Sequence, residues 1–412
     1  TGKRTGNNLV MLFDRPSHME PLFPKATKPL VDLAMEVFRK EAELGGLVHP
    51  VTRKEIARLL RHINSYYSNR IEGEHTNPVD IERAVRKEYS KDEEKKRLQK
   101  LSVAHIEVQK LIDDRFENGE DIPVCSTEFL CWIHREFYSR VSDSFLKIRK
   151  RNSKETIEMV PGELRTQNVE VGEHVAPVHG VLDVFLSHFE KKYDPEKLSG
   201  HMLLLAAAAS HHRLAWIHPF LDGNGRVSRL FTYAYLRRAN IESHGLWTLS
   251  RGLARKDEDY KNYLAGADSL RRGDVDGRGN LSEKALNAFC SFFFETALDQ
   301  IHFMKKLLNL EDLRDRILAY GNLRAQGSIP GEAALRPETK YVLAEVMMRG
   351  KIERGEVQRL IGMAERTARD LTKQLLEEEL VRSDSHRSPL YFNIPPKVVG
   401  YYFPELYPAG SI

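Results

Sequence analysis

Apolar residues return at helical spacing through most of the chain. They recur every three or four positions between Lys28 and Leu44 and again from Arg53 to Glu72, which predicts two amphipathic helices. Gly73 ends the second of these helices. Thr76-Asn77-Pro78 has the form of an N-cap followed by proline and predicts the next helix, and Ser126 is expected to cap a later one.

The helical pattern continues over the middle of the chain. It predicts helices at 181–189, 198–214, 226–238 and 282–308. The run LLLAAAAS inside the second of them is small and apolar, as is typical of the central helix of a bundle. The predicted fold class is therefore mainly α, a helical bundle.

One segment departs from the helical pattern. Residues 156–160 and 169–172 alternate between apolar and polar positions, and Pro161-Gly162 stands between them as a turn signal. We therefore expect a β-hairpin in this part of the chain.

The C-terminal part has a pattern of its own. Polar and turn residues accumulate over 321–330, which predicts a linker. Short helices are predicted at 338–348, 353–361 and 365–380, followed by a two-stranded wing in the stretch VRSDSHRSPLYFNI. This arrangement resembles a winged helix.

Composition narrows the choice of environment and partner. The chain has 412 residues, of which 41% are hydrophobic, and its 63 Lys and Arg against 59 Asp and Glu leave a net charge of +4. This balance argues against general attraction to nucleic acid or membranes. Three cysteines without CxxC spacing and no apolar run of ~20 residues predict a cytoplasmic protein that does not enter membranes. The 16 histidines form no HExxH zinc pattern.

The stretch IHPFLDGNGRVSR, residues 217–229, carries the strongest chemical signal. Gly223 and Gly225 precede a predicted helix, and a glycine loop at a helix N-terminus presents N–H groups to phosphate oxygens. Arg226 and Arg229 lie one turn apart and can reach the same anion. An adjacent carboxylate, Asp222, suits Mg²⁺, and a neutral His218 can take a proton from a hydroxyl.

This stretch resembles, without a mismatch, the signature of the Fic family, whose members transfer AMP from ATP to protein hydroxyls. The resemblance implies a Fic-type helical bundle with His218 as the general base, Asp222 as the Mg²⁺ ligand and Phe220 as an anchor in the core. Arg229 is expected to bind the γ-phosphate. The α- and β-phosphates are expected to bind to Gly223, Asn224, Gly225 and Arg226.

Two further segments match parts of this family. Gly162-Glu163-Leu164-Arg165 with Val169, Glu170, Val171 and Gly172 resembles the flap, an edge that aligns the target protein by strand addition. Tyr260 corresponds to a residue that borders the adenine in some relatives. The role of Asp268, in the same stretch, is left open.

An inhibitory motif of one Fic subgroup is similar to the segment from Ser68 to Gly73. In that comparison the Glu72 carboxylate pairs with Arg229 and displaces the γ-phosphate of ATP, so that basal transfer is low. In some relatives the equivalent glutamate also helps to remove AMP from the target. We therefore expect an autoinhibited enzyme with ATP and Mg²⁺ as cofactors.

The resemblance divides the chain into three predicted domains: an N-terminal helical region with the inhibitory helix (1–100), a Fic core with a helical extension (101–320) and a winged-helix-like domain (330–400). The third helix of the last domain could contact DNA through Arg366, Thr367, Arg369 and Lys373. The acidic run at 377–379 opposes this interpretation. Protein docking or dimer formation is an equal alternative for this domain.

Two functions of different class remain at this point. The first is a protein adenylyltransferase acting on Tyr, Ser or Thr of a target protein, with modification of the enzyme itself as a further option. The second is a DNA-binding regulator in which the Fic core senses a nucleotide. An intact His218 favours the first function, since a sensor needs no base beside the phosphates.

Overall fold

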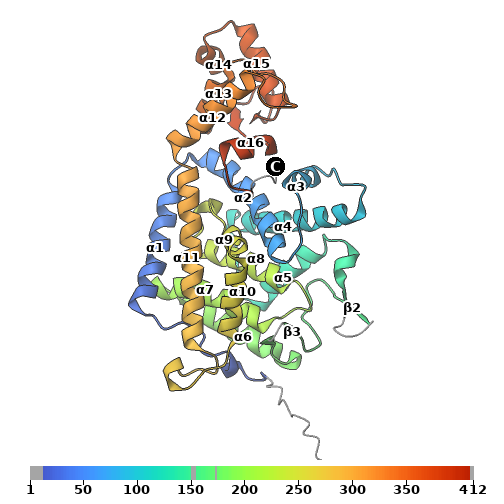
Figure 1. Ribbon diagram of the computed structural model, residues 1–412, viewed down its shortest axis with the longest axis vertical. Helices are drawn as coiled ribbons and strands as arrows, with labels where there is room; N and C mark the ends of the chain where they lie inside the picture. The colour runs from blue at the N-terminus through green and yellow to red at the C-terminus, as the bar shows by residue number, and fades with distance from the viewer. Residues whose placement is uncertain (1–12, 150–154, 172–173, 409–412) are drawn as a thin grey trace, which may run out of the picture. The chain divides into compact units, whose positions relative to one another are not determined.

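The structure is a computed structural model that describes residues 13–149, 155–171 and 174–408, and helices dominate it (Figure 1). The N-terminal and central α-helices are α1 (Lys28–Gly45), α2 (Pro50–Ile71), α3 (Pro78–Val85), α4 (Glu93–Glu117), α5 (Thr127–Tyr138), α6 (Leu182–Tyr193), α7 (Gly200–Ile217), α8 (Asn224–Arg238), α9 (Leu249–Arg255) and α10 (Asp257–Asp268). The later ones are α11 (Glu283–Leu307), α12 (Leu310–Ala325), α13 (Thr339–Arg349), α14 (Arg354–Ile361), α15 (Glu365–Glu377) and α16 (Pro396–Tyr402). The predicted mainly helical fold class is confirmed.

The chain divides into two compact units, each assembled from distant segments. The described residues of the first unit lie within 13–35, 111–239 and 256–295. Those of the second lie within 36–110, 240–255 and 296–408.

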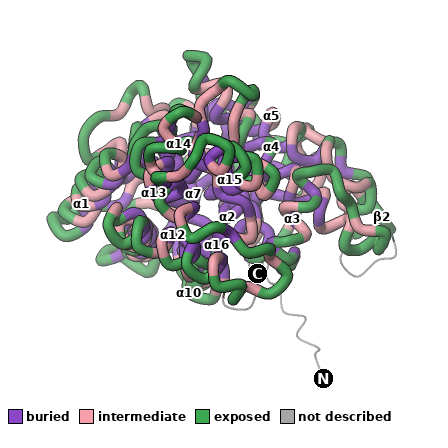
Figure 2. The backbone as a smooth tube through the Cα atoms, turned by 90° about the horizontal axis from the view of Figure 1, so that it is seen from above, coloured by how far each residue is buried: buried purple, intermediate pink, exposed green. Residues whose placement is uncertain are grey.

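Helix α7 is the centre of the first unit. Almost every residue from Leu204 to Ile217 is buried, and the tube is purple along most of this helix in Figure 2. Four consecutive alanines at 206–209 keep its surface narrow, so that α6 and α8 pack directly against it. Ser126 accepts a hydrogen bond from the Phe129 N–H (3.1 Å) and caps α5 as predicted.

Two short hairpins replace the predicted one. Strand β1 (Lys147–Arg149) pairs with β2 (Thr156–Glu158), and β3 (Glu170–Val171) pairs with β4 (His174–Val175), both antiparallel. The expected pairing between residues 156–160 and 169–172 is therefore wrong. The segment between the two runs is held elsewhere, because the Gly162 N–H donates to the His134 ring (2.8 Å) and Arg165 is buried.

Helix α2 is the long buried helix of the second unit, and α9 packs along it. Its predicted end is confirmed: Glu72 is the C-cap, and Gly73 follows with φ +81°, a conformation that favours glycine. Asn77 caps the next helix as expected, since its side chain accepts from the Val79 N–H (2.8 Å).

The C-terminal part of the second unit contains the three predicted short helices, α13, α14 and α15. A three-stranded antiparallel sheet in the order β5-β7-β6 accompanies them, formed by β5 (Lys351–Ile352), β6 (Val381–Arg382) and β7 (Leu390–Phe392). We refer to residues 339–394 as the C-terminal module. The sequence pattern missed α16, which follows it.

The predicted linker at 321–330 is wrong in its first half, because α12 continues to Ala325. Gly321 is where α12 meets α13: a Cβ there would lie 2.4 Å from the Lys340 Cβ. A glycine that sequence reasoning assigns to a break thus serves close helix packing.

All three cysteines of the chain lie in the described part and are free thiols. Among the described residues, none of the helices combines the length and apolar character needed to cross a membrane.

Candidate active site

The loop between α7 and α8 is closed by its own side chains. His218 ends α7 in the left-handed conformation (φ 50°, ψ 62°), which turns the chain sharply. The Asn224 side chain then accepts from the Phe220 N–H (2.9 Å) and donates to the Phe220 carbonyl (2.8 Å), joining both ends of the loop. Phe220 itself is fully buried, as expected of an anchor, and stacks on His134 at 4.1 Å.

Gly223 is required by two features of this loop. Its φ of +80° is a conformation that side chains rarely adopt, and it is the residue immediately before α8. A Cβ at this position would also lie 2.3 Å from the Tyr138 hydroxyl oxygen. The loop can therefore bring its backbone close to the start of α8 only with glycine at 223.

Two arginines are buried near the N-terminal end of α8. Arg226 and Arg229 are each only 4% exposed. Arg226 donates to the Tyr138 hydroxyl (3.4 Å) and lies 5.9 Å from the centre of the Phe137 ring. A helix N-terminus already carries partial positive charge, so cations are unfavourable there in the absence of an anion. This end of α8 is accordingly suited to a strongly negative ligand.

His218 has the proton arrangement of a base. Its Nδ1 lies 3.3 Å from the Ala215 carbonyl, and because a carbonyl only accepts, Nδ1 carries the hydrogen in this bond. In this tautomer Nε2 is the nitrogen that can accept a proton. Both His218 and Asp222 are half-buried, so their side chains are accessible from solvent while the loop between them is packed.

Arg165 holds the loop in place through hydrogen bonds to its backbone. The sequence analysis named this residue only as part of the predicted flap. It is 2% exposed and donates to the His218 carbonyl (2.7 Å) and the Gln167 carbonyl (2.8 Å). Burial lowers the pKa of its guanidinium to about 10. Its backbone N–H also donates to the Pro219 carbonyl (2.9 Å), so this residue joins the predicted flap segment to the loop.

His134 is a second residue that the sequence did not reveal. Burial lowers the pKa of its imidazole to about 4, which keeps the ring neutral. A neutral ring can accept the Gly162 N–H at Nδ1 and stack on Phe220. The signal that would have found it, a histidine on the apolar face of α5, is shared with many packing residues.

The predicted flap residues lie in or beside the second hairpin. Glu170 and Val171 form β3, and the Val169 carbonyl accepts from the Ala176 N–H (3.2 Å). Gly172 lies outside the described residues. Their role in aligning a target stays a prediction.

Tyr260 is in the core of the first unit. It is 3% exposed, and its hydroxyl donates to His211 Nε2 (2.8 Å), while His211 Nδ1 donates to the Thr232 hydroxyl (2.6 Å). Burial lowers the pKa of His211 to about 3, consistent with a neutral ring. This chain of hydrogen bonds ties α10 to α7 and α8, whereas contact of Tyr260 with adenine stays a prediction.

Asp268, at the end of α10, serves a separate contact. Its carboxylate accepts from His212 Nε2 at 3.1 Å, because His212 Nδ1 already accepts from Arg213 (2.7 Å). Asp268 is thus a structural partner of α7.

The predicted inhibitory residues belong to the second unit. Ser68 is buried within α2, Glu72 is an exposed residue at its C-terminal end, and Gly73 follows. Glu74, the next residue, pairs with Arg97 at 3.1 Å. The inhibitory role of this segment stays a prediction.

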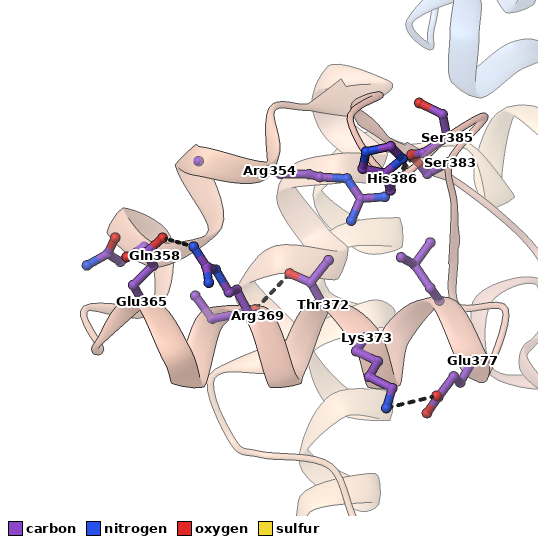
Figure 3. A pocket seen from close by; sticks show the side chains of 13 residues that line it. Arg354, Gln358, Glu365, Arg369, Thr372, Lys373, Glu377, Ser383, Ser385 and His386 are labelled. Carbon is purple, nitrogen blue, oxygen red and sulfur yellow. Dashed lines mark hydrogen bonds and ion pairs between the residues drawn. The ribbon is translucent and has the colours of Figure 1, made fainter.

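The C-terminal module contains a groove of about 680 Å³ between α14, α15 and the loop after β6 (Figure 3). Arg354, Arg369 and Lys373 line it together with Glu365 and Glu377. Arg369 pairs with Glu365, and Lys373 lies 3.7 Å from Glu377. Because charges of both signs alternate, the groove does not form a positive patch, and DNA contact through Arg366, Thr367, Arg369 and Lys373 stays a prediction.

The predicted Mg²⁺ ligand is the carboxylate of Asp222. Within the described ranges there is no group of three or more His, Cys, Asp or Glu side chains that could hold an ion. Mg²⁺ is commonly held by one or two carboxylates together with substrate phosphates. Asp222, beside the start of α8, fits such a shared site.

The site lies in a mainly helical domain in which a glycine loop precedes a helix that carries two buried arginines. The family follows from comparison. Residues 124–236 match the model of the Fic/DOC family, and this range contains the loop and most of α8. Residues 124–236 are therefore similar to the Fic/DOC family, in agreement with the resemblance seen in the signature.

Relatives and a solved structure agree with this assignment. Over 78 residues the chain is 42% identical to proteins named "Protein adenylyltransferase Fic" from Drosophila erecta and Aedes aegypti. The match covers 19% of this chain and 16% of each relative, so it spans a small part of their length. A fragment of Fic-1 from C. elegans shares the fold, with a TM-score of 0.50 and 15% identity over 67% of this chain and 71% of that fragment.

Proposed function

We propose that this protein transfers AMP from ATP to a hydroxyl side chain of a target protein. The observation that carries the proposal is the geometry of His218, whose Nδ1 is engaged by the Ala215 carbonyl directly before a glycine loop and two buried arginines. The similarity to proteins named adenylyltransferase points in the same direction. A nucleotide sensor would need the phosphate site but no base.

The triphosphate binds at the start of α8. Backbone N–H groups of Gly223, Asn224 and Gly225 and the Arg226 guanidinium hold the α- and β-phosphates, and Arg229 holds the γ-phosphate. Asp222, together with the phosphates, would hold Mg²⁺, which would supply positive charge for the leaving pyrophosphate. The ends of the loop are fixed by Asn224 in advance, which limits the entropy lost on binding.

His218 starts the chemical step. Its Nε2 takes the proton of the target hydroxyl while that oxygen forms a bond to the α-phosphorus and the bond to the β-phosphate oxygen breaks. AMP stays on the target, and pyrophosphate leaves. Arg165, which holds the His218 carbonyl, keeps the imidazole at its position during this step.

The second hairpin is the proposed guide for the target. Glu170 and Val171 in β3 present an edge to which an extended segment of the target can add by backbone hydrogen bonds, with Val169 and Gly172 flanking it. The acceptor is then a Tyr, Ser or Thr of that segment. Tyr260 is proposed to support the adenine side of the site.

Glu72 is the proposed inhibitor of this reaction. Its carboxylate at the end of α2 pairs with Arg229 and takes the place of the γ-phosphate, with Ser68 and Gly73 completing the inhibitory motif. Such a charged hydrogen bond is worth about 1.5–3 kcal/mol, enough to hold basal activity roughly 10- to 100-fold below the released level. The same glutamate could position a water that removes AMP from the target.

A cell-lysate experiment tests the proposal. The Glu72→Gly variant is incubated with lysate, Mg²⁺ and isotopically tagged ATP, and proteins carrying tagged AMP are identified by mass spectrometry. We expect AMP on hydroxyl side chains with this variant and none with Glu72→Gly/His218→Ala. Equal labelling by both variants would show that the loop is not the catalytic site.

A further inference from the structure

Helix α2, which ends at the proposed inhibitory residue, is attached to the C-terminal module. At its first turn the Thr52 hydroxyl donates to the Met347 carbonyl of α13 (2.8 Å), and both atoms are buried. Gly350, after α13, lies so close that a Cβ there would be 2.4 Å from His49 Nδ1, the ring that caps α2. The N-terminal end of α2 therefore rests directly on α13.

Ionic contacts extend this attachment along the next two turns. The Glu55 carboxylate, 8% exposed, accepts from Arg382 of β6 (2.8 Å) and pairs with Arg58 (3.1 Å). Arg58 also donates to the Asn393 side chain (2.6 Å), just after β7. A buried carboxylate that loses one of its cations is destabilised, so this contact is sensitive to single substitutions.

The chain after the module holds the other end of α2. The Tyr67 hydroxyl donates to the Leu406 carbonyl (3.1 Å), and the Tyr66 ring meets the Tyr407 ring edge to face at 5.2 Å. Tyr66 and Tyr67 stand one to two turns before Glu72. Contacts from the C-terminal part of the chain thus reach along most of the length of α2.

A helix transmits such contacts to its end. Helix α2 has 22 residues, about 33 Å, and its hydrogen-bonded backbone moves largely as one body. Met347, Arg382, Asn393, Leu406 and Tyr407 are thereby positioned to set where Glu72 stands. The residues that make these contacts lie within the second unit and are not among the proposed reacting groups.

We propose that the C-terminal module and the chain that follows it hold α2 in its inhibitory position, and that loosening this attachment releases the enzyme. The inference rests on the proposed AMP transfer and its inhibition by Glu72. Arg382 is then a positioning residue for Glu72, because it acts through Glu55 and the helix. A regulator would act on activity by binding the module and shifting α2.

The test measures AMP incorporation by four forms of the full chain: unaltered, Glu72→Gly, Arg382→Ala and Arg382→Ala/Glu72→Gly. We expect Arg382→Ala to raise incorporation by about fivefold or more, the usual lower end of coupling between sites. The double variant should equal Glu72→Gly, since a released helix has nothing further to release. Arg349→Ala, which removes two ion pairs inside the module, with Glu345 and Glu356, is the matched control and should equal the unaltered chain.

The outcomes separate the two proposals. An active Glu72→Gly with an unchanged Arg382→Ala would overturn the attachment while leaving the inhibition intact. A double variant more active than Glu72→Gly would also overturn it, because Arg382 would then act by another route. An unchanged Glu72→Gly would reject the inhibition by Glu72 itself.

Hydrogen exchange gives a readout that does not depend on activity. In Arg382→Ala, and in the milder Asn393→Ala, backbone amides of residues 66–72 should exchange at least about fivefold faster than in the Arg349→Ala control. A purely structural role of Arg382 would speed exchange in the module but leave residues 66–72 unchanged. That result would contradict the inference even if the variant were less stable.

Discussion

Two helices of the molecule, α8 and α15, each carry two basic side chains one turn apart, and the two pairs differ in burial. Arg226 and Arg229 on α8 are 4% exposed, whereas the side chains of Arg369 and Lys373 on α15 are 77% and 75% exposed. Exposed pairs on one helix contribute only about 0.3–0.5 kcal/mol and exchange freely with water. Buried cations keep a fixed position, which favours precise hydrogen bonds to a phosphate, so we place the proposed chemistry at α8.

The largest expected effect is at the base. His218→Ala in the Glu72→Gly background should lower AMP incorporation at least about 100-fold, because the proposed proton acceptor is lost. His201→Ala, an exposed histidine at the other end of α7, is the control and should leave the rate unchanged. A residual rate within tenfold would mean that His218 is not the base.

The next expected effect is a loss of folding stability at low pH, caused by protonation of His134, which packs against the loop. The pKa of His134 is about 4 in the folded protein, below the ordinary value of 6.5. The neutral ring therefore makes its full contribution to the free energy of unfolding above pH 6.5. That contribution should be lost as the pH falls from 6.5 to 4, by about 3 kcal/mol in total. Urea unfolding at pH 7 and pH 4.5 measures it.

Two variants sharpen this pH test. His134→Gln should flatten the fall in stability over that range, while His386→Ala, at an exposed histidine of the module groove, should leave it unchanged. Parallel pH profiles for both variants would reject the role of His134.

The third prediction addresses the comparison of the two basic regions directly. Arg229→Ala in the Glu72→Gly background should weaken transfer by roughly 10- to 100-fold, chiefly by raising KM for ATP, since a charged hydrogen bond to phosphate is lost. Arg369→Ala should change it by less than about twofold, the range of an exposed pair. Steady-state kinetics at varied ATP separates them, and equal effects would remove the distinction that we draw.

The smallest expected effect is on the free energy of unfolding when the N-cap residue of a helix is changed. Ser126→Ala should lower the free energy of unfolding by about 1 kcal/mol, because α5 loses its capping bond. Helix α15 begins at Ala364 in an extended conformation without a side-chain cap, so Ala364→Ser should raise stability by a similar amount. Denaturant unfolding of both variants checks the pair, and a loss in each would contradict the capping argument.

Local features of the fold were predictable, and contacts across the fold were not. The caps at Asn77 and Ser126 and the end of α2 at Gly73 depend on neighbouring residues, and all three are confirmed. The hairpin and the linker failed because the Gly162 N–H bonds to a distant ring and Gly321 packs against Lys340. Residues remote in sequence decided both outcomes.

The candidate site shows the same limit. The order of residues from His218 to Arg229 was enough to predict a glycine loop followed by a helix. It was not enough to show that Arg165 is buried beneath the loop, because an arginine is usually exposed and its burial depends on the carbonyls of other segments. His134 was missed for the same reason.

The position of the label in ATP tests the central claim most directly. The Glu72→Gly variant is incubated with a target, or with itself, and with ATP radiolabelled at either the α- or the γ-phosphate. AMP transfer predicts that protein takes up the α-label and none of the γ-label, and that His218→Ala abolishes the uptake. Uptake of the γ-label, or of neither label, would contradict the account.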